Sequence, residues 1–181
     1  MGKSGVSEEL KQRGYNIITV ENLAESSLIL EDSSGSKVVD VIKMDKKLRK
    51  MKVENGFVVG HLAHWLSVDM VIVLRARVSI IEKRLEARGY SRKKARENAE
   101  AEAIDLITTE ALERCNRVYE IDCSYKSVKK ITDEVEEILM GKVDRDRDKD
   151  RDKDRDKDTD KDRDRYKPGK IDFSEEVLNW F

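Results

Sequence analysis

A tripeptide that could bind phosphate stands almost at the first residue of this chain. The sequence opens MGKSGVSEEL, and Gly2, Lys3 and Ser4 match the last three letters of the phosphate loop Gly-x-x-x-x-Gly-Lys-Ser/Thr. Backbone N–H groups at the amino end of a helix, beside the small Gly2, can surround phosphate oxygens. Lys3 would then bridge the β- and γ-phosphates of ATP, and the Ser4 hydroxyl would ligate Mg²⁺. On these residues alone, an ordinary leader before a capped helix is an equally good interpretation.

The elements around the tripeptide have the order that a phosphate loop requires. An amphipathic stretch follows at 4–13, and then a short apolar run at 17–20. Further apolar runs lie at 57–60, 70–74 and 118–122, and helical patterns separate them at 45–53, 79–88, 91–115 and 127–140. The short unbroken runs predict parallel strands buried on both faces. We therefore expect a three-layer α/β fold, with a parallel sheet and helices on both of its faces.

Composition limits the class of protein. The 181 residues suffice for one domain with a core and are few for two. The 37 basic and 38 acidic side chains nearly cancel, so nucleic acid could be recognised only by a local patch. No apolar run approaches the ~20 residues that span a bilayer, and Cys115 and Cys123 lack the spacing of a metal site. We expect a cytoplasmic protein with no membrane partner and no disulfide.

One segment differs sharply in composition from the rest. Residues 143–166 read VDRDRDKDRDKDRDKDTDKDRDRY, with aspartate at every even position from Asp144 to Asp164. Like charges four residues apart oppose a helix, and nothing apolar is present to bury, so we predict a disordered insert. A tether for RNA or for a basic protein tail is the alternative. The insert would separate a kinase-sized domain at 1–142 from a C-terminal segment at 167–181, which we expect to dock on the core through four apolar residues: Val177, Leu178, Trp180 and Phe181.

Longer motifs carry a resemblance to a known family. The stretches VENLAES, GHLAHWLSVDMVIVLRA, RLEARGYSRKKARENAEAEAIDLITTEALE and VYEID together resemble the adenylate kinase isoenzyme six family, also called coilin-interacting nuclear ATPase in animals. The likeness covers residues 2 to about 140, and the terminal GKIDFSEEV is typical of archaeal members. The family implies a P-loop fold of the nucleoside-monophosphate kinase type. It also implies ATP and Mg²⁺ as cofactors, AMP or another nucleoside monophosphate as acceptor, and a platform ribosomal protein of the small-subunit precursor as partner.

The resemblance assigns roles to particular residues. Gly2, Lys3 and Ser4 match the end of the ATP loop, and Gly5 stands where the family usually has a second hydroxyl. Residues 20–43 correspond to the monophosphate-binding segment, and residues 87–97 to a short lid whose Arg88 matches an ATP-contacting arginine. A lid arginine closes over the transferring phosphoryl group and neutralises charge. A basic residue facing the carboxyl end of a helix dipole is the alternative for Arg88.

Two departures from the family pattern raise further expectations. In FVVGHLAH the family has Asp-x-His; His61 is present as a polar active-site residue, but Val59 replaces the carboxylate that supports Mg²⁺ or a water. His64 is expected to lie on a helix surface or to pack. P-loop kinases also carry their central strand before the loop, whereas only Met1 precedes Gly2 here. We therefore expect the native start to lie about ten residues upstream.

These observations lead to one hypothesis with two rivals. The first is a nucleoside-monophosphate kinase catalysing ATP + AMP ⇌ 2 ADP, with ATPase activity and a part in late small-subunit maturation. In it Lys3 and Arg88 hold phosphates, Ser4 holds Mg²⁺ and His61 orients a water or the acceptor. The second is a ribosome-assembly factor that is switched by nucleotide binding and has little kinase turnover. The third is a protein whose incomplete loop binds no nucleotide.

Overall fold

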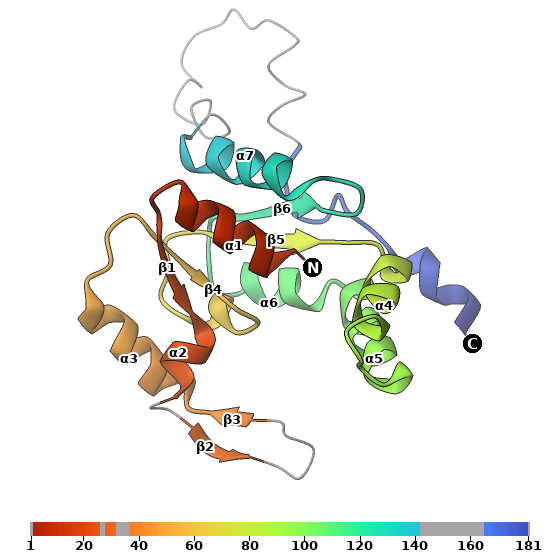
Figure 1. The fold of residues 1–181 in the computed structure, drawn as a ribbon, viewed down its shortest axis with the longest axis horizontal. Helices are drawn as coiled ribbons and strands as arrows, with labels where there is room; N and C mark the ends of the chain where they lie inside the picture. The colour runs from red at the N-terminus through yellow and green to blue at the C-terminus, as the bar shows by residue number, and fades with distance from the viewer. Residues whose placement is uncertain (1, 26–27, 32–36, 142–164, 181) are drawn as a thin grey trace, which may run out of the picture. The chain divides into compact units, whose positions relative to one another are not determined.

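The structure, a computed structural model, describes residues 2–25, 28–31, 37–141 and 165–180. Most of the predicted disordered insert, at 143–164, therefore lies outside the described residues. Its predicted end is wrong, because Tyr166 is 3% exposed and accepts a backbone hydrogen bond from Glu120. Two compact units make up the chain: one comprises residues 3–69, and the other comprises residues 70–181 together with the first two residues. Each unit contains a two-stranded parallel sheet with helices attached to it (Figure 1).

The unit formed by residues 3–69 is built on the parallel pair β1 (Asn16–Thr19) and β4 (Gly56–Val59), in which Ile17 lies opposite Phe57. Its helices are α1 (Lys3–Gln12), α2 (Val20–Ala24), α3 (Val41–Met51) and the 3₁₀ turn η1 (Ala63–Trp65). An antiparallel hairpin, β2 (Leu28–Glu31) with β3 (Lys37–Val39), completes it. The buried core of this unit comes from the sheet, α2, α3 and η1: Ile18, Val20, Leu23, Met44, Leu48 and Leu66.

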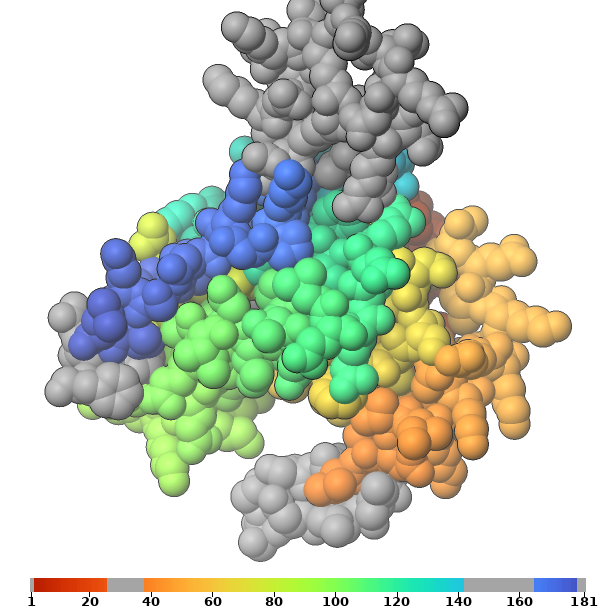
Figure 2. Space-filling view, turned by 180° about the vertical axis from the view of Figure 1, so that it is seen from behind, coloured from red at the N-terminus to blue at the C-terminus, as the bar shows by residue number. Residues whose placement is uncertain are grey.

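The unit formed by residues 70–181 is built on β5 (Val71–Arg75) and β6 (Val118–Asp122), which are also parallel. Its helices are α4 (Val78–Glu86), α5 (Arg92–Ala103), α6 (Leu106–Leu112), α7 (Val128–Leu139) and the 3₁₀ helix η2 (Ser174–Trp180). A cluster of small and aliphatic residues joins α4, α5 and the C-terminal segment: Ala76, Val78, Ile81, Leu85, Ala95, Ala99, Ala103 and Phe173. Figure 2 shows this C-terminal segment, in blue, lying against the light green surface of α4 and α5.

Capping side chains and glycines mark the ends of several helices. Asp40, Ser91 and Ser127 each accept a hydrogen bond from the backbone N–H three residues later, so α3, α5 and α7 have ordinary N-caps. The turns after α1 and α4 pass through Gly14 and Gly89, whose φ angles of +92° and +82° suit glycine. Both glycines stand where the sequence pattern stops being helical.

The predicted α/β class with parallel strands is confirmed, and all four apolar runs form strands. Four details differ. The expected burial of strands on both faces is wrong for β4, in which Phe57, Val58 and Val59 are only partly buried; in the described part of the chain, β4 pairs with β1 alone. Val20 begins a helix instead of ending a strand, and the β2–β3 hairpin was not predicted.

The fourth difference is a break in the long helix expected at 91–115. Two helices form there, α5 and α6, separated at Ile104 and Asp105, and Asp105 has a φ of +53°. The Asp105 carboxylate pairs with the buried guanidinium of Arg75 from β5. This contact stabilises the left-handed conformation of Asp105, and no periodicity in the helix sequence reveals it.

Candidate functional site

Lys3, Ser4 and Gly5 form the first turn of α1, directly after Gly2. The first four N–H groups of an α-helix have no partner within the helix, so this turn presents donors and the positive end of the helix dipole. Ser4 and Gly5 are exposed and Lys3 is half-buried, while Val6 and Leu10 are buried on the other face of the helix. No acidic residue occupies the first turn to oppose an anion. The turn therefore has the geometry and the charge of a phosphate-binding helix end.

The sheet edge at the carboxyl ends of β1 and β4 belongs to the same unit. A short turn through Gly14 joins α1 to β1, and the two elements contact each other, so they run in opposite directions and the amino end of α1 faces this edge (Figure 1). In parallel α/β sheets, ligands bind beyond the carboxyl ends of the strands. Lys3, Ser4 and His61 thus belong to the same unit of the chain.

Gly60 fixes the shape of this edge. A Cβ atom placed on Gly60 would lie 2.4 Å from the Cβ of Val20, at the start of α2. Only glycine allows the chain leaving β4 to pass so close to α2. His61 follows at once and is exposed, as a side chain that could reach a nucleotide must be.

The other histidine has a packing role. His64 lies in η1 and is 4% exposed, with its ring centroid 6.0 Å from that of Trp65. A buried ring beside an aromatic neighbour matches the packing interpretation of His64. It does not suit a metal ion bound jointly by His64 and the exposed His61. Among the described residues, no group of three or more His, Cys, Asp or Glu side chains could hold a metal ion.

Asp45 anchors the loop that follows η1. Its carboxylate accepts hydrogen bonds from Ser67 N–H at 2.6 Å, from Ser67 Oγ at 3.0 Å and from Arg49 Nε at 2.8 Å. Burial acts to raise the pKa of Asp45, but these donors outweigh it and hold the pKa below its ordinary value. The segment from His61 to Ser67 is therefore tied to α3 at its far end and to α2 at Gly60.

Val59 ends β4 at the position where the resemblance leads one to expect a carboxylate. It is partly buried and supplies no oxygen to a metal ion. The carboxylate that follows β1 is Glu21, exposed in the first turn of α2.

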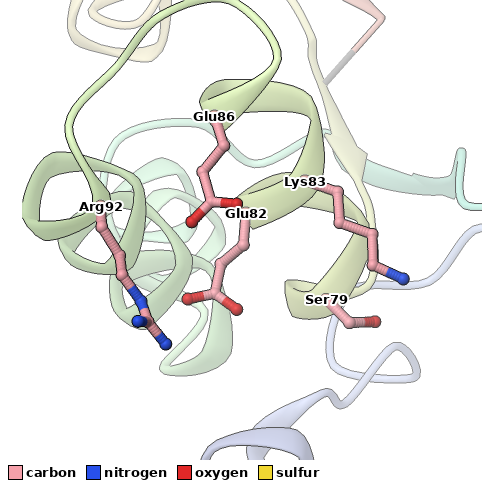
Figure 3. A pocket seen from close by; sticks show the side chains of 5 residues that line it. All are labelled: Ser79, Glu82, Lys83, Glu86 and Arg92. Carbon is pink, nitrogen blue, oxygen red and sulfur yellow. The ribbon is translucent and has the colours of Figure 1, made fainter.

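Arg88 belongs to the other unit. It lies in the turn between α4 and α5, where its N–H donates to the carbonyl of Leu85 and its side chain is exposed. An open pocket of about 380 Å³ lies between the same two helices. Figure 3 shows Glu82 and Glu86 extending from α4 on the side of Arg92, with Lys83 and Ser79 along the same helix. Arg88 stands just past the negative end of α4, as its helix-dipole interpretation requires, and its contact with ATP stays a prediction.

Charged and aromatic residues at the carboxyl ends of β5 and β6 escaped the sequence analysis. Arg77 begins α4, and its guanidinium lies 6.0 Å from the ring of Tyr125, which is 82% exposed. The Arg77 N–H donates to Ser124 Oγ at 3.0 Å, which links the two strand ends. The signal available in the sequence was an arginine pair, Arg75 and Arg77, directly after an apolar run.

Comparisons with known proteins agree with this geometry. Residues 1–105 match the family model described as an AAA domain. The chain is 38% identical over 177 residues to a protein of Archaeoglobus fulgidus named "Putative adenylate kinase", across 97% of this chain and 88% of the relative. Proteins of the same name from Thermococcus onnurineus and Methanococcus maripaludis are 41% and 38% identical, across 76% and 75% of this chain and 78% and 81% of their own.

The fold and the amino end of α1 define a class, the α/β nucleotide-binding proteins of the P-loop type. Within that class, the chain belongs to the AAA domain family and to the family of these archaeal adenylate kinase relatives. In the described residues, no helix is long and apolar enough to cross a membrane.

Proposed function

We propose that the protein is a nucleoside-monophosphate kinase that catalyses ATP + AMP ⇌ 2 ADP, of the isoenzyme-six type. The observation that carries the proposal is the Gly2-Lys3-Ser4 sequence at the exposed amino end of α1, facing the carboxyl edge of a parallel strand pair. The names of the relatives, which align over most of the chain, support the same activity.

The residues of α1 fit the triphosphate of ATP. The N–H groups of the first turn, the Lys3 ammonium and the Ser4 hydroxyl form a cationic, donor-rich surface, and the first turn holds no acidic residue. In this proposal Lys3 neutralises charge on the transferring phosphoryl group, and Gly2 and Gly5 leave room for phosphate oxygens. Mg²⁺, held in part by Ser4, supplies further charge neutralisation when it is bound.

The proposal also assigns roles to His61 and Arg88, which belong to different units. His61 is exposed at the carboxyl end of β4 and would orient the acceptor or a water. Arg88, exposed in the turn between α4 and α5, would close over the phosphates as a lid arginine. Phosphoryl transfer requires little covalent chemistry from the protein, so these roles are positioning and electrostatic stabilisation.

A coupled assay with a charge-matched control tests the proposal. ADP formation from ATP and AMP is measured for the parent chain, for Lys3→Met and for Lys11→Met. Lys11 is an exposed cation in the last turn of the same helix. We expect Lys3→Met to lower kcat/KM by about 10²–10³-fold, as loss of a transition-state donor does, and Lys11→Met to leave it within about twofold. Equal activity of the two variants would refute the role of Lys3, and undetectable ADP from the parent chain would refute the kinase proposal.

Val59 favours a second candidate function. Val59 leaves the end of β4 without a carboxylate, which would slow phosphoryl transfer. An assembly factor that acts on the small-subunit precursor and is switched by nucleotide needs nucleotide binding and slow hydrolysis, but little kinase turnover. The distinguishing result is ATP hydrolysis that rises on addition of a small-subunit platform ribosomal protein while AMP phosphorylation stays undetectable. Val59→Asp, with Val59→Asn as its uncharged control, tests whether the missing carboxylate is the cause of low turnover. If the missing acid limits turnover, only the aspartate variant should hydrolyse or transfer faster, by about tenfold or more.

A further inference from the structure

Helix α4 starts without a cap of its own. Its N-cap residue is Arg77, which makes no side-chain capping bond. By contrast, the local residues Thr19, Asp40, Ser91 and Ser127 cap α2, α3, α5 and α7. An uncapped first turn leaves backbone donors unsatisfied and lets the turn fray. Because α4 leads directly to the turn that carries Arg88, its order matters for the proposed lid.

The missing cap comes from the C-terminal segment, 97 residues away along the chain. Glu176 in η2 accepts a hydrogen bond from Ser79 N–H at 3.1 Å. Ser79 is the second residue of α4, one of the two positions whose N–H an N-cap side chain normally bonds. The other carboxylate oxygen of Glu176 accepts from Arg77 Nη1 at 3.0 Å. One carboxylate thus satisfies the helix end and pairs with the cation beside it.

Apolar packing holds Glu176 at this place. Phe173 is 7% exposed within the cluster formed by α4 and α5, and Ile171 and Val177 pack against the same cluster. The Phe173 ring also lies 5.9 Å from the guanidinium of Arg77. Of the four residues expected to dock, Val177 packs against the cluster, whereas Leu178 is 71% exposed, so the prediction is wrong for Leu178. The side chains of Trp180 and Phe181 lie outside the described residues. Phe173, which was not predicted, is the buried residue of this face.

Backbone contacts fix the start of the same segment to β6. The Glu120 N–H donates to the carbonyl of Tyr166 at 3.0 Å, and Gly169 N–H donates to Glu120 Oε2 at 2.9 Å. Tyr166 is 3% exposed and donates its hydroxyl to Glu137 of α7. The segment is therefore attached at both ends, to β6 and α7 first and to α4 and α5 afterwards.

We propose that Glu176 is a positioning residue, which caps α4 and thereby holds the α4–α5 turn, with Arg88 in it, in the conformation used for phosphoryl transfer. The kinetic part of this inference rests on the proposed function. The structural part does not, because the cap acts whether or not nucleotide is bound.

Hydrogen exchange on the full chain tests the structural part. Loss of an N-cap typically costs about 1 kcal/mol, so we expect Glu176→Ala to speed exchange of amides in residues 78–91 roughly fivefold. Glu176→Gln keeps an acceptor for Ser79 N–H and should show a smaller increase. Glu175→Ala, which removes an exposed acid from the same 3₁₀ helix, is the matched control and should show none. Unchanged exchange in Glu176→Ala, or an equal increase in Glu175→Ala, would overturn the proposal.

Steady-state kinetics test the positioning part against plain destabilisation. Ile138→Val removes a methyl group from a fully buried residue of α7 and should lower the melting temperature without touching α4. We expect Glu176→Ala to lower kcat/KM for ATP at least threefold, Glu176→Gln to retain part of it, and Ile138→Val to retain all of it. Faster exchange without any kinetic change would reduce Glu176 to a structural cap and overturn the positioning role. If the parent chain has no kinase turnover, the proposed function fails and the exchange experiment alone decides whether Glu176 fixes the turn.

Discussion

Replacing Arg75 by methionine removes the cation at the centre of a buried charge cluster. Arg75 is 1% exposed, and its guanidinium pairs with three carboxylates: Glu102 at 2.5 Å, Glu120 at 2.5 Å and Asp105. Burial alone would lower the pKa of Arg75, but Glu102 and Glu120 outweigh it and raise the pKa. The arginine is therefore charged at every pH at which the protein folds.

The size of the effect follows from what the substitution leaves behind. The Glu120 side chain is fully buried and would keep only Thr108 Oγ1 and Gly169 N–H as donors. Removing one partner of a buried ion pair typically costs about 3–5 kcal/mol, a large part of the ~5–15 kcal/mol that stabilises a domain. With a urea m-value of about 2 kcal/mol/M, the unfolding midpoint of Arg75→Met should fall by about 2 M.

Urea unfolding followed by circular dichroism measures this shift, and two further variants serve as comparisons. Arg77→Met removes an arginine two residues further on, whose side chain is 47% exposed, and should cost no more than about 1 kcal/mol. The double variant Arg75→Met with Glu120→Gln removes the uncompensated charge and should recover at least about 1 kcal/mol. A midpoint for Arg75→Met equal to that of Arg77→Met would refute the reasoning.

Three further predictions concern single residues. Asp45→Asn should cost about 1–2 kcal/mol at pH 7. Because the folded pKa of Asp45 lies below its ordinary value, its contribution to stability is full above the unfolded pKa and disappears as pH falls through the folded pKa. The melting temperatures of the two proteins should therefore converge as the pH is lowered below the ordinary pKa of aspartate, and a pH-independent gap would contradict this. Gly60→Ala should lower the melting temperature, since its Cβ meets Val20 at 2.4 Å; an unchanged melt would show that α2 can move. Burial raises the pKa of Cys123 to about 12, so iodoacetamide at pH 8 should label half-buried Cys115 first, and equal rates would be inconsistent with that burial.

The sequence alone located most of the secondary structure. Short apolar runs became β1, β4, β5 and β6, because a parallel strand with apolar residues on both faces leaves an unmistakable pattern. Polar caps and glycines marked helix ends for the same local reason, and the Gly2-Lys3-Ser4 tripeptide proved to open α1. These features depend on neighbours within a few residues, which a sequence displays directly.

Only the tertiary structure decided the contacts between distant residues. The long helix expected at 91–115 is divided at Asp105, whose left-handed conformation is stabilised by an ion pair with Arg75, 30 residues earlier in the sequence. The first turn of α4 is capped by Glu176, near the carboxyl end of the chain. The burial of Tyr166 and Phe173 places the C-terminal segment against β6, α4 and α5. Such pairings depend on how the helices and strands pack against one another. The side-chain periodicity of one element does not indicate which other element it contacts.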